Sequence, residues 1–595
     1  MLIDLAILGL FVIYAVVTGL RARKQASKNL EEYFLAGRSL SGWQAGVSMA
    51  ATQYAADTPL LVTGLVATAG VFSLWRLWIY AIAFLMLGFF FSGGWRRSGV
   101  LTDAEFTELR YRGKAAGALR ALKAIHLGTL FNCSVLAMVL IAAVRISEPF
   151  VSWHTWLPGG LITPVANALQ FLDVNLSSVP LGHSDVWNLS ASNLISILMI
   201  VSFTTLYSTT GGLRAVVATD MVQFAIAMIA TLIYAWIVVS KVGGLPELVR
   251  KMSELYGDEA SRRTLAFFPA RWDLEMMPIL GVLFVQWFAQ SNADGSGYLA
   301  QRTMACKTDK DARNASIIFT FLQVVVRSLF WLPIAIGLLV LYPAAGLPGA
   351  GEATEAFRVG REATFALGIR DFLPAGIRGL MLTGLLAALA STVDTHLNWG
   401  ASYWTHDLYE RHLAPKLLKR EPSTRELVWV ARFSNVGLIT LALFIMARLS
   451  SIQAAWHITL LFGSGLGVVL ILRWIWWRIN IWSEYAAALS SIILAPILLT
   501  QFPELGEGGK LLAMVFISTF AVVGVTLLTK PEQVETLVLF YQRVKPPGFW
   551  GPIAQKAGDS SETPLTLFKK ALVATALTSF VVFALLYIGC KLLFG

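Results

Sequence analysis

SGWQAGVSMAATQYAADTP, residues 41–59, lies in a segment that is long enough to cross a membrane but has polar residues at its centre. A membrane span needs about 20 mostly apolar residues. Gln53, Asp57 and the pair Thr58-Pro59 fall near the middle of this one. Pro59 lacks a backbone donor and disfavours a helical conformation at the residue before it. The pattern predicts a membrane helix that is broken near mid-depth.

A second segment, 273–299, shows the same feature. Its centre reads QSNADGSG (290–297), a run of poor helix formers inside an apolar frame. Irregular backbone at membrane depth is tolerated only where it lines a cavity or is buried in protein. Paired interruptions in two halves of a chain indicate a transporter site built from discontinuous helices. The alternative, that each patch is a helix–helix packing seam, explains the small residues but not Asp57 and Asp294.

The composition places these segments in a lipid bilayer. Of the 595 residues, 56% are hydrophobic and only 14% are charged, and the mean hydropathy is +0.65. A soluble fold leaves too many residues in contact with water to hide this apolar surface. We therefore expect an all-α integral membrane protein with about 14 transmembrane helices, at 2–20, 41–71, 73–95, 118–147, 191–210, 215–240, 273–299, 313–342, 372–400, 427–448, 452–475, 482–500, 510–529 and 569–591.

The distribution of Lys and Arg predicts the orientation. Loops 21–40 and 96–117 carry several basic residues, whereas loop 148–190 carries none. Basic residues concentrate in the short cytoplasmic loops of membrane proteins. Loop 241–272 does not fit, but it is longer and also acidic. With an even number of helices, we expect a multi-pass protein of the cell (plasma) membrane with both termini outside.

Helix 372–400 carries two adjacent hydroxyls, Ser391 and Thr392, in an otherwise apolar stretch. A monovalent cation prefers oxygen ligands, and a broken helix opposite this pair would free backbone carbonyls to complete its coordination. The alternative is that both side chains bond back to the preceding turn of their own helix. Asp394 favours the functional interpretation, because intramembrane acids are costly and usually functional.

Several further stretches share one resemblance. They are EEYFLAGRSL (31–40), LTDAEF (101–106) with RYRG (110–113), GGLRAV (211–216) continuing to Thr219, Asp220 and Gln223, Gln301-Arg302, and AALAST (387–392). Their order and content resemble the sodium:solute symporter family, which includes sodium–glucose, sodium–proline and sodium–sialic acid transporters. The likeness covers roughly residues 30–480.

The resemblance implies a leucine-transporter-like (LeuT) 5+5 inverted repeat core with extra N- and C-terminal helices. The implied parts are an N-terminal helix and cytoplasmic loop (1–40), a first repeat (41–240), an external loop (241–272), a second repeat (273–480), and C-terminal helices (481–595) with a cytoplasmic linker (530–568).

The resemblance also implies a site for the coupling ion, Na⁺. Its ligands would be the backbone oxygens of Ala51, Tyr54 and Ala388 and the hydroxyls of Ser391 and Thr392. Asp220 matches an acid of the family near the inward path of the ion. In the sialic acid relatives a second sodium uses that acid and later hydroxyls. Here those later positions are Asp394 and Thr395, so a second cation would have a different ligand set.

The substrate positions depart further from the family pattern. Polar residues at the two breaks and on three other core helices are the candidates, namely Gln53, Asp57, Arg76, Gln290, Ser291, Asn292, Asp294, Gln323, Arg327, Trp456 and His457. Arg76 either snorkels to the outer interface or, like Arg327, marks a partner or a substrate anion. Arg327 could instead pair with Asp57, and His457 could be a hydrogen-bonded core histidine.

The function predicted from these features is sodium-coupled symport of a small polar solute, either a sugar, polyol, amino acid or organic acid. Proton coupling in the same fold is the nearest alternative, followed by a membrane-embedded sensor. We find no phosphate-binding loop or metalloprotease motif and expect no enzyme activity. The net charge of +11 lies mostly in short loops, so we expect no nucleic-acid partner and no obligate protein partner.

Overall fold

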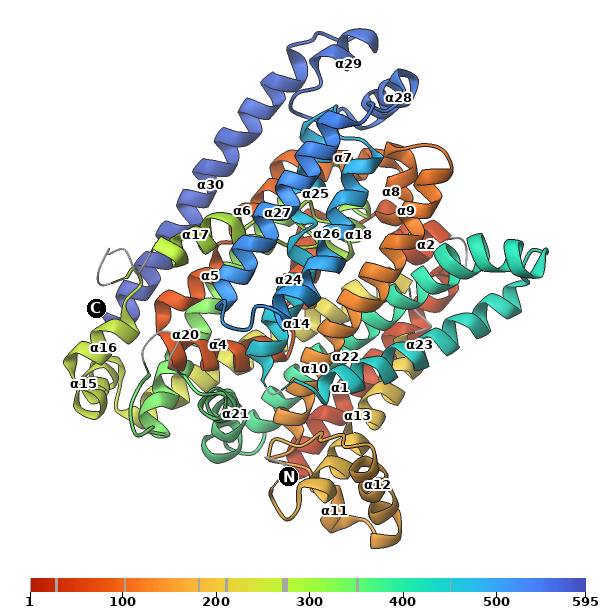
Figure 1. Cartoon of the computed structure of the whole chain (residues 1–595). Coiled ribbons are helices and arrows are strands. Elements are labelled where there is room, and N and C mark those ends of the chain that lie inside the picture. Colours follow the sequence, from red (N-terminus) through yellow and green to blue (C-terminus); the bar gives the residue numbers. More distant parts are fainter. Residues whose placement is uncertain are drawn as a thin grey trace.

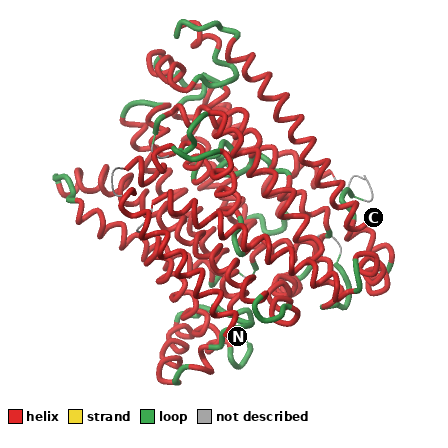
Figure 2. Tube along the Cα trace, turned by 180° about the vertical axis from the view of Figure 1, so that it is seen from behind, coloured by secondary structure: helices red, strands yellow, loops and turns green. Residues whose placement is uncertain are grey.

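Most of the chain is helical in the computed structural model (Figures 1 and 2). It describes residues 2–26, 30–100, 103–179, 182–208, 212–269, 277–348, 353–449 and 451–595, and no β-strand occurs within these ranges. The prediction of an all-α protein is confirmed. Labels with η mark 3₁₀ or π turns.

The helices up to residue 265 belong to the part predicted as the first repeat and its flanks. They are α1 (Leu2–Ala26), α2 (Leu30–Leu35), η1 (Ala36–Arg38), α3 (Gly42–Gln53), α4 (Asp57–Ala69), η2 (Val71–Leu74), α5 (Trp75–Trp78), α6 (Ala81–Met86), η3 (Leu87–Phe91), α7 (Ser92–Ser98), α8 (Asp103–Arg110), α9 (Lys114–Ile125), η4 (His126–Phe131), α10 (Asn132–Ser147), α11 (Trp153–Trp156), α12 (Gly159–Phe171), α13 (Val186–Ser208), α14 (Gly212–Val242), α15 (Leu245–Tyr256) and α16 (Asp258–Leu265).

The remaining helices belong to the predicted second repeat and the C-terminal part. They are α17 (Met277–Gln286), α18 (Tyr298–Met304), α19 (Asp309–Thr320), η6 (Phe321–Val326), α20 (Arg327–Leu341), α21 (Glu355–Phe372), α22 (Ile377–Ser402), η7 (Tyr403–Leu418), α23 (Thr424–Met446), α24 (Ile452–Ser464), α25 (Gly467–Ile475), α26 (Ile481–Thr500), α27 (Glu507–Leu528), α28 (Val534–Val544), α29 (Gly551–Lys556) and α30 (Thr563–Phe594).

Eleven helical stretches among the described residues are long and apolar enough to cross a membrane. Each coincides with one of the expected spans. The other three expected spans are not among these eleven: 41–71 holds the short helices α3 and α4, 191–210 falls on α13, whose apolar part is only Val186–Ser202, and 273–299 holds the short helices α17 and α18. The count of fourteen spans therefore stays a prediction.

The first break lies at residues 54–56, between α3 and α4. Thr58 is itself helical, so the expectation that Pro59 removes it from the helix is wrong. The reason is that Pro59 stands in the first turn of α4, where a missing backbone N–H is tolerated. The N–H of Thr58 donates to the carbonyl of Ala55 at 3.2 Å, and this bond starts the new helix.

The second break runs over residues 287–297, between α17 and α18. Two glycines explain its path. Gly295 has a φ of +82°, and a Cβ there would lie 2.4 Å from Leu87. A Cβ on Gly467, at the start of α25, would lie 1.7 Å from the carbonyl oxygen of Phe288. Only glycine at these positions allows the broken segment to pass so close to its neighbours.

The two broken helices lie within the bundle. α3 packs against α14 and α19, and α4 packs against α10, α20, α21 and α24. α22, which carries Ser391 and Thr392, packs against α3, α10 and α14. α26 packs against α27, and α30 runs along one edge of the molecule (Figure 1).

The chain has distinct ends along the bundle. The N-terminus lies at the end that also carries α11 and α12, whereas α28 and α29 lie at the opposite end (Figure 1). The segment 530–568 is folded rather than a loose linker. Arg97 Nε donates to the carbonyl of Val544 at 3.0 Å, the N–H of Phe549 donates to Ile475 at 2.6 Å, and Trp550 Nε1 donates to Trp474 at 2.6 Å.

Candidate functional site

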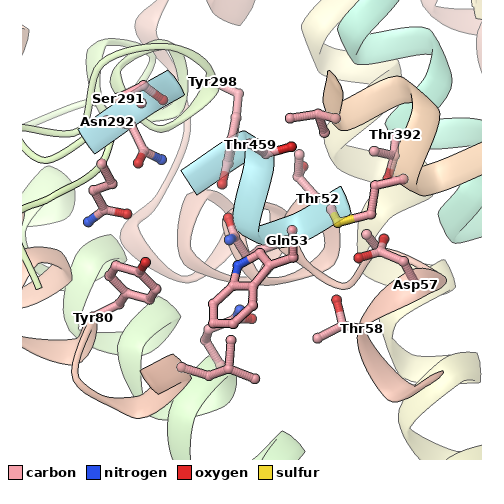
Figure 3. A pocket seen from close by; sticks show the side chains of 18 of the residues that line it. Thr52, Gln53, Asp57, Thr58, Tyr80, Ser291, Asn292, Tyr298, Thr392 and Thr459 are labelled. Carbon is pink, nitrogen blue, oxygen red and sulfur yellow. The ribbon is translucent and has the colours of Figure 1, made fainter. Parts of the chain in front are cut away.

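A cavity of about 250 Å³ lies between the two breaks. Residues of α4, α10, α20, α22 and α24 line it together with both broken segments. Figure 3 shows Thr52, Asp57 and Thr392 on one side of this space and Ser291 and Asn292 on the other. The structure thus brings polar residues far apart in the sequence into the lining of one small, mostly apolar cavity.

Most of the predicted substrate residues line this cavity. The lining contains Gln53, Asp57, Gln290, Ser291, Asn292, Gln323, Arg327 and Trp456. Gln323 stands in the π turn η6, directly before α20, and π turns often occur at functional sites. That these eight residues contact a solute stays a prediction.

Asp57 and Arg327 face the cavity as buried charges. Asp57 is 3% exposed and Arg327 is 6% exposed. Arg327 Nη1 donates to the carbonyl of Gln53 at 2.9 Å, and its guanidinium carbon lies 4.5 Å from the centre of the Trp331 ring. The two charged groups interact electrostatically, but they form no ion pair within 4.0 Å. Arg327 and Asp57 therefore do not form the direct ion pair that was one alternative for this arginine.

Asp294 lies outside the cavity lining. One of its oxygens accepts from Arg473 Nη2 at 2.6 Å and from Trp474 Nε1 at 2.7 Å. The other accepts from the hydroxyl of Ser296 at 2.6 Å. Because both oxygens are engaged and the residue is 0% exposed, we do not include Asp294 among the proposed solute contacts. It holds the second break against α25.

Arg76 and His457 also lie outside the lining. Arg76 Nη1 is 3.0 Å from Nε2 of His457 and 3.6 Å from a carboxylate oxygen of Glu507. Nδ1 of His457 is 2.5 Å from the other Glu507 oxygen. These contacts connect α5, α24 and the first residue of α27. Arg76 also stacks on Trp456, which does line the cavity, at 4.9 Å.

The predicted sodium ligands lie on α3, at the first break and on α22. Ala51, Tyr54 and Ala388 are each buried. In a continuous helix the N–H of Thr58 would bond the carbonyl of Tyr54, but here it donates to Ala55. The break therefore frees a carbonyl of the kind a sodium ion needs. The Thr392 hydroxyl donates to the carbonyl of Ala388 at 2.9 Å. This is the bond to the preceding helical turn that was the alternative to a role in sodium binding.

Asp220 connects the first broken helix to α22. Its carboxylate accepts from the hydroxyl of Ser48 at 2.6 Å, lies 3.7 Å from Arg302 Nη2, and interacts with the Ser391 side chain. Asp220 is therefore a neighbour of the predicted sodium position on α22. Thr395 lines the cavity. Asp394 lies in α22, but its side chain is outside the described residues.

Sequence reasoning missed several polar residues of the lining. They are Thr52, Thr58, Tyr80, Asp103, Ser296, Tyr298, Ser328, His396, Trp399 and Thr459. Four of them lie next to or within a break, and this position could have marked them as cavity residues: Thr52, Thr58, Ser296 and Tyr298. Asp103 gave no such signal because it falls in an expected loop, yet its carboxylate accepts from the N–H of Gly297 at 3.1 Å.

A central cavity between two discontinuous helices, with polar residues in its lining, is typical of a secondary transporter. The family model described as "Sodium:solute symporter family" matches residues 33–154 and 187–494, more than half of the chain. The chain belongs to the sodium:solute symporter family. It is a sodium-coupled symporter of a small solute and an integral, multi-pass membrane protein, not an enzyme.

Individual relatives agree with this assignment. The chain is 26% identical over 471 residues to a "Sodium/glucose cotransporter" of Vibrio parahaemolyticus, covering 76% of each chain. It is 24% identical over 508 residues to "Sodium/glucose cotransporter 1" of Oryctolagus cuniculus, covering 80% of this chain and 69% of the relative.

A solved structure shares the fold. It is described as the substrate-bound outward-open state of a Na⁺-coupled sialic acid symporter, and it matches with a TM-score of 0.63 at 18% identity. The match covers 89% of this chain and 99% of that one. The predicted LeuT-like architecture is confirmed at this level.

Proposed function

We propose that the solute is a small polar molecule that binds in the cavity between the two breaks. The observation that carries this proposal is a set of buried polar atoms without a hydrogen-bond partner on lining residues: Gln53 Oε1, Asp57 Oδ1, Gln323 Oε1, Arg327 Nε and Thr459 Oγ1. An unpaired buried polar atom costs roughly 1–3 kcal/mol. A polar solute offers partners to these atoms, which an apolar solute does not.

The coupling sodium ion binds beside this cavity, at the carbonyls of Ala51, Tyr54 and Ala388 and the hydroxyls of Ser391 and Thr392. Two features support this position. α3 packs against α22, and Thr392 is both a proposed ligand and part of the cavity lining. An ion at Thr392 would therefore lie close enough to the solute to favour its binding, which is what coupled transport requires.

Alternating access follows from the organisation into repeats 41–240 and 273–480, which move relative to each other around the central site. The helices of 1–40 and 481–595 are additions to this core. The protein resides in the cell membrane with both termini outside, and the mechanism needs neither a protein partner nor nucleic acid.

Uptake into proteoliposomes tests the proposed function. Radiolabelled sugars, polyols, amino acids and organic acids are offered to the reconstituted protein under an inward sodium gradient, and potassium replaces sodium in the control. At least one small polar solute should accumulate only with sodium. Equal uptake driven by a proton gradient without sodium would contradict the coupling, and uptake that survives simultaneous loss of Gln53 and Asn292 side chains would contradict the site.

A further inference from the structure

Arg327 is a charged group without a charged contact. Its guanidinium is 6% exposed, and the described residues place no carboxylate within 4.0 Å of it. Among the described residues its hydrogen bond goes to the neutral carbonyl of Gln53 at 2.9 Å, and Nε has no hydrogen-bond partner there. Burying an unpaired charge is costly, so this arrangement calls for a negative group inside the cavity.

Asp57 lines the same cavity, and one of its carboxylate oxygens lacks a hydrogen-bond donor among the described residues, just as Arg327 lacks an acidic contact there. Its Oδ1 atom has no partner, and the same holds for the side-chain oxygens of Gln53 and Gln323. A carboxylate oxygen accepts hydrogen bonds and never donates when it is ionised. These positions therefore call for hydrogen-bond donors on whatever fills the cavity.

The other candidate for an anion site is already satisfied. Arg76 lies within 3.6 Å of Glu507 and outside the cavity lining. Arg327 is therefore the arginine available to a solute. A planar guanidinium binds a carboxylate through two parallel hydrogen bonds, with both orientation and strength.

We propose that the solute is a hydroxy- or amino-carboxylate. Its carboxylate binds Arg327, and its hydroxyl or ammonium groups donate to Asp57, Gln53 and Gln323. This assignment rests on the proposed function, because it takes the cavity between the breaks as the solute site. A neutral solute would leave the Arg327 guanidinium without a carboxylate in direct contact, since Asp57 interacts with it only at longer range, and a carboxylate without donors would leave the oxygen atoms unpaired.

Matched probe pairs test the assignment by thermal stabilisation of the purified full chain in sodium chloride and in potassium chloride. The pairs are D-gluconate with D-glucitol and D-galacturonate with D-galactose, and L-proline is an amino-carboxylate probe without a pair. Bound ligand stabilises the native state by mass action. At least one carboxylate should bind at least tenfold more tightly than its neutral counterpart, and only in sodium.

Arg327→Gln should abolish this preference by weakening binding of the carboxylate at least tenfold, while binding of its neutral counterpart changes less than threefold. Arg327→Lys keeps the charge and should recover part of the preference, which separates loss of recognition from loss of folding. Arg432→Gln is the matched control, because Arg432 is exposed on α23 beside Trp429 and should leave all probes unaffected.

The two proposals fail in different ways. If a neutral probe binds with sodium dependence as tightly as the carboxylates, or if Arg327→Gln weakens both members of a pair equally, the carboxylate assignment is wrong and the sodium-coupled site stands. If no carboxylate stabilises the protein, the assignment is also wrong. Binding that is the same in sodium and potassium would overturn the coupled site itself.

Discussion

Ser391 and Thr392 are neighbours on α22 but have different surroundings. Thr392 lines the cavity and bonds back to Ala388 at 2.9 Å, whereas Ser391 interacts with the carboxylate of Asp220. The back-bond uses the hydroxyl hydrogen of Thr392, so the oxygen lone pairs stay available to the proposed sodium ion. In the proposed site the two hydroxyls would both act as ligands.

Removing both hydroxyls should weaken the sodium site. Ser391→Ala with Thr392→Ala is expected to raise the sodium concentration for half-maximal uptake at least tenfold, about 1.4 kcal/mol or more. Proteoliposome uptake at varied sodium measures this change. Thr383→Ala is the matched control, since Thr383 is a buried hydroxyl on the same helix without a hydrogen-bond partner. Unchanged sodium dependence in the double variant would refute the site.

Gln53 and Asn292 come from the two breaks and both line the cavity. Gln53→Ala or Asn292→Ala should weaken solute binding about tenfold, because each removes a hydrogen bond made in a partly dry space. Sodium binding should change less than threefold. Thermal stabilisation at varied solute measures solute binding, and thermal stabilisation at varied sodium measures sodium binding. Asn435→Ala, an amide on α23 outside the lining, is the control. Full solute affinity in both cavity variants would place the solute elsewhere.

At the scale of single elements, α21 meets the start of α24 through Glu362. The side chain is 0% exposed, and it accepts from the N–H groups of Ile452 at 3.0 Å and Gln453 at 2.9 Å. α21 is not among the helices apolar enough to span a membrane. Burial raises the pKa of Glu362 from 4.5 to about 7, although the two N–H groups and Arg145 act to lower it.

A raised carboxyl pKa stabilises the folded protein at low pH, and this contribution is lost as the pH rises through the folded value. Wild-type protein should therefore lose stability, on the order of 2 kcal/mol, between pH 5 and pH 8. Glu362→Gln, which cannot ionise, should not show this loss. Melting temperatures across this range measure both proteins. Glu259→Gln, at an exposed position on α16, should follow the wild type, and parallel profiles for all three proteins would contradict the interpretation.

The breaks were predictable from sequence because their causes are local. Poor helix formers at Gly295 and Gly297 interrupt a helix wherever it lies, and both glycines have positive φ angles. The position of Asp294 was not predictable. Its partner Arg473 stands 179 residues away along the chain, and no local pattern shows which of two neighbouring polar residues turns toward a cavity. The same limit applies to Arg76, whose acidic neighbour Glu507 lies beyond the region of the family likeness.

For the whole molecule, orientation in the membrane is the main open prediction. Both termini are expected outside, so a cysteine added after Gly595 should react with an impermeant reagent in intact cells. The native Cys133, Cys306 and Cys590 are all buried, which keeps the background low. The unmodified chain is the control for background labelling. If the added cysteine reacts only after permeabilisation, the number of spans or the orientation is wrong.

The separation between Asp294 and the cavity bears on how specificity evolves in such proteins. The acid that lies in the middle of the second break is tied to Arg473 and Trp474, so substituting it would disturb the scaffold before it changed what is carried. The lining residue Arg327 has a single hydrogen bond, to the Gln53 carbonyl, and the side chain of Asn292 forms none with the described residues. Descendants of one ancestral chain could therefore exchange one cargo for another through a few cavity substitutions while keeping the scaffold intact. Overall sequence similarity between two relatives would then say little about whether they carry the same solute, because a few cavity positions decide that.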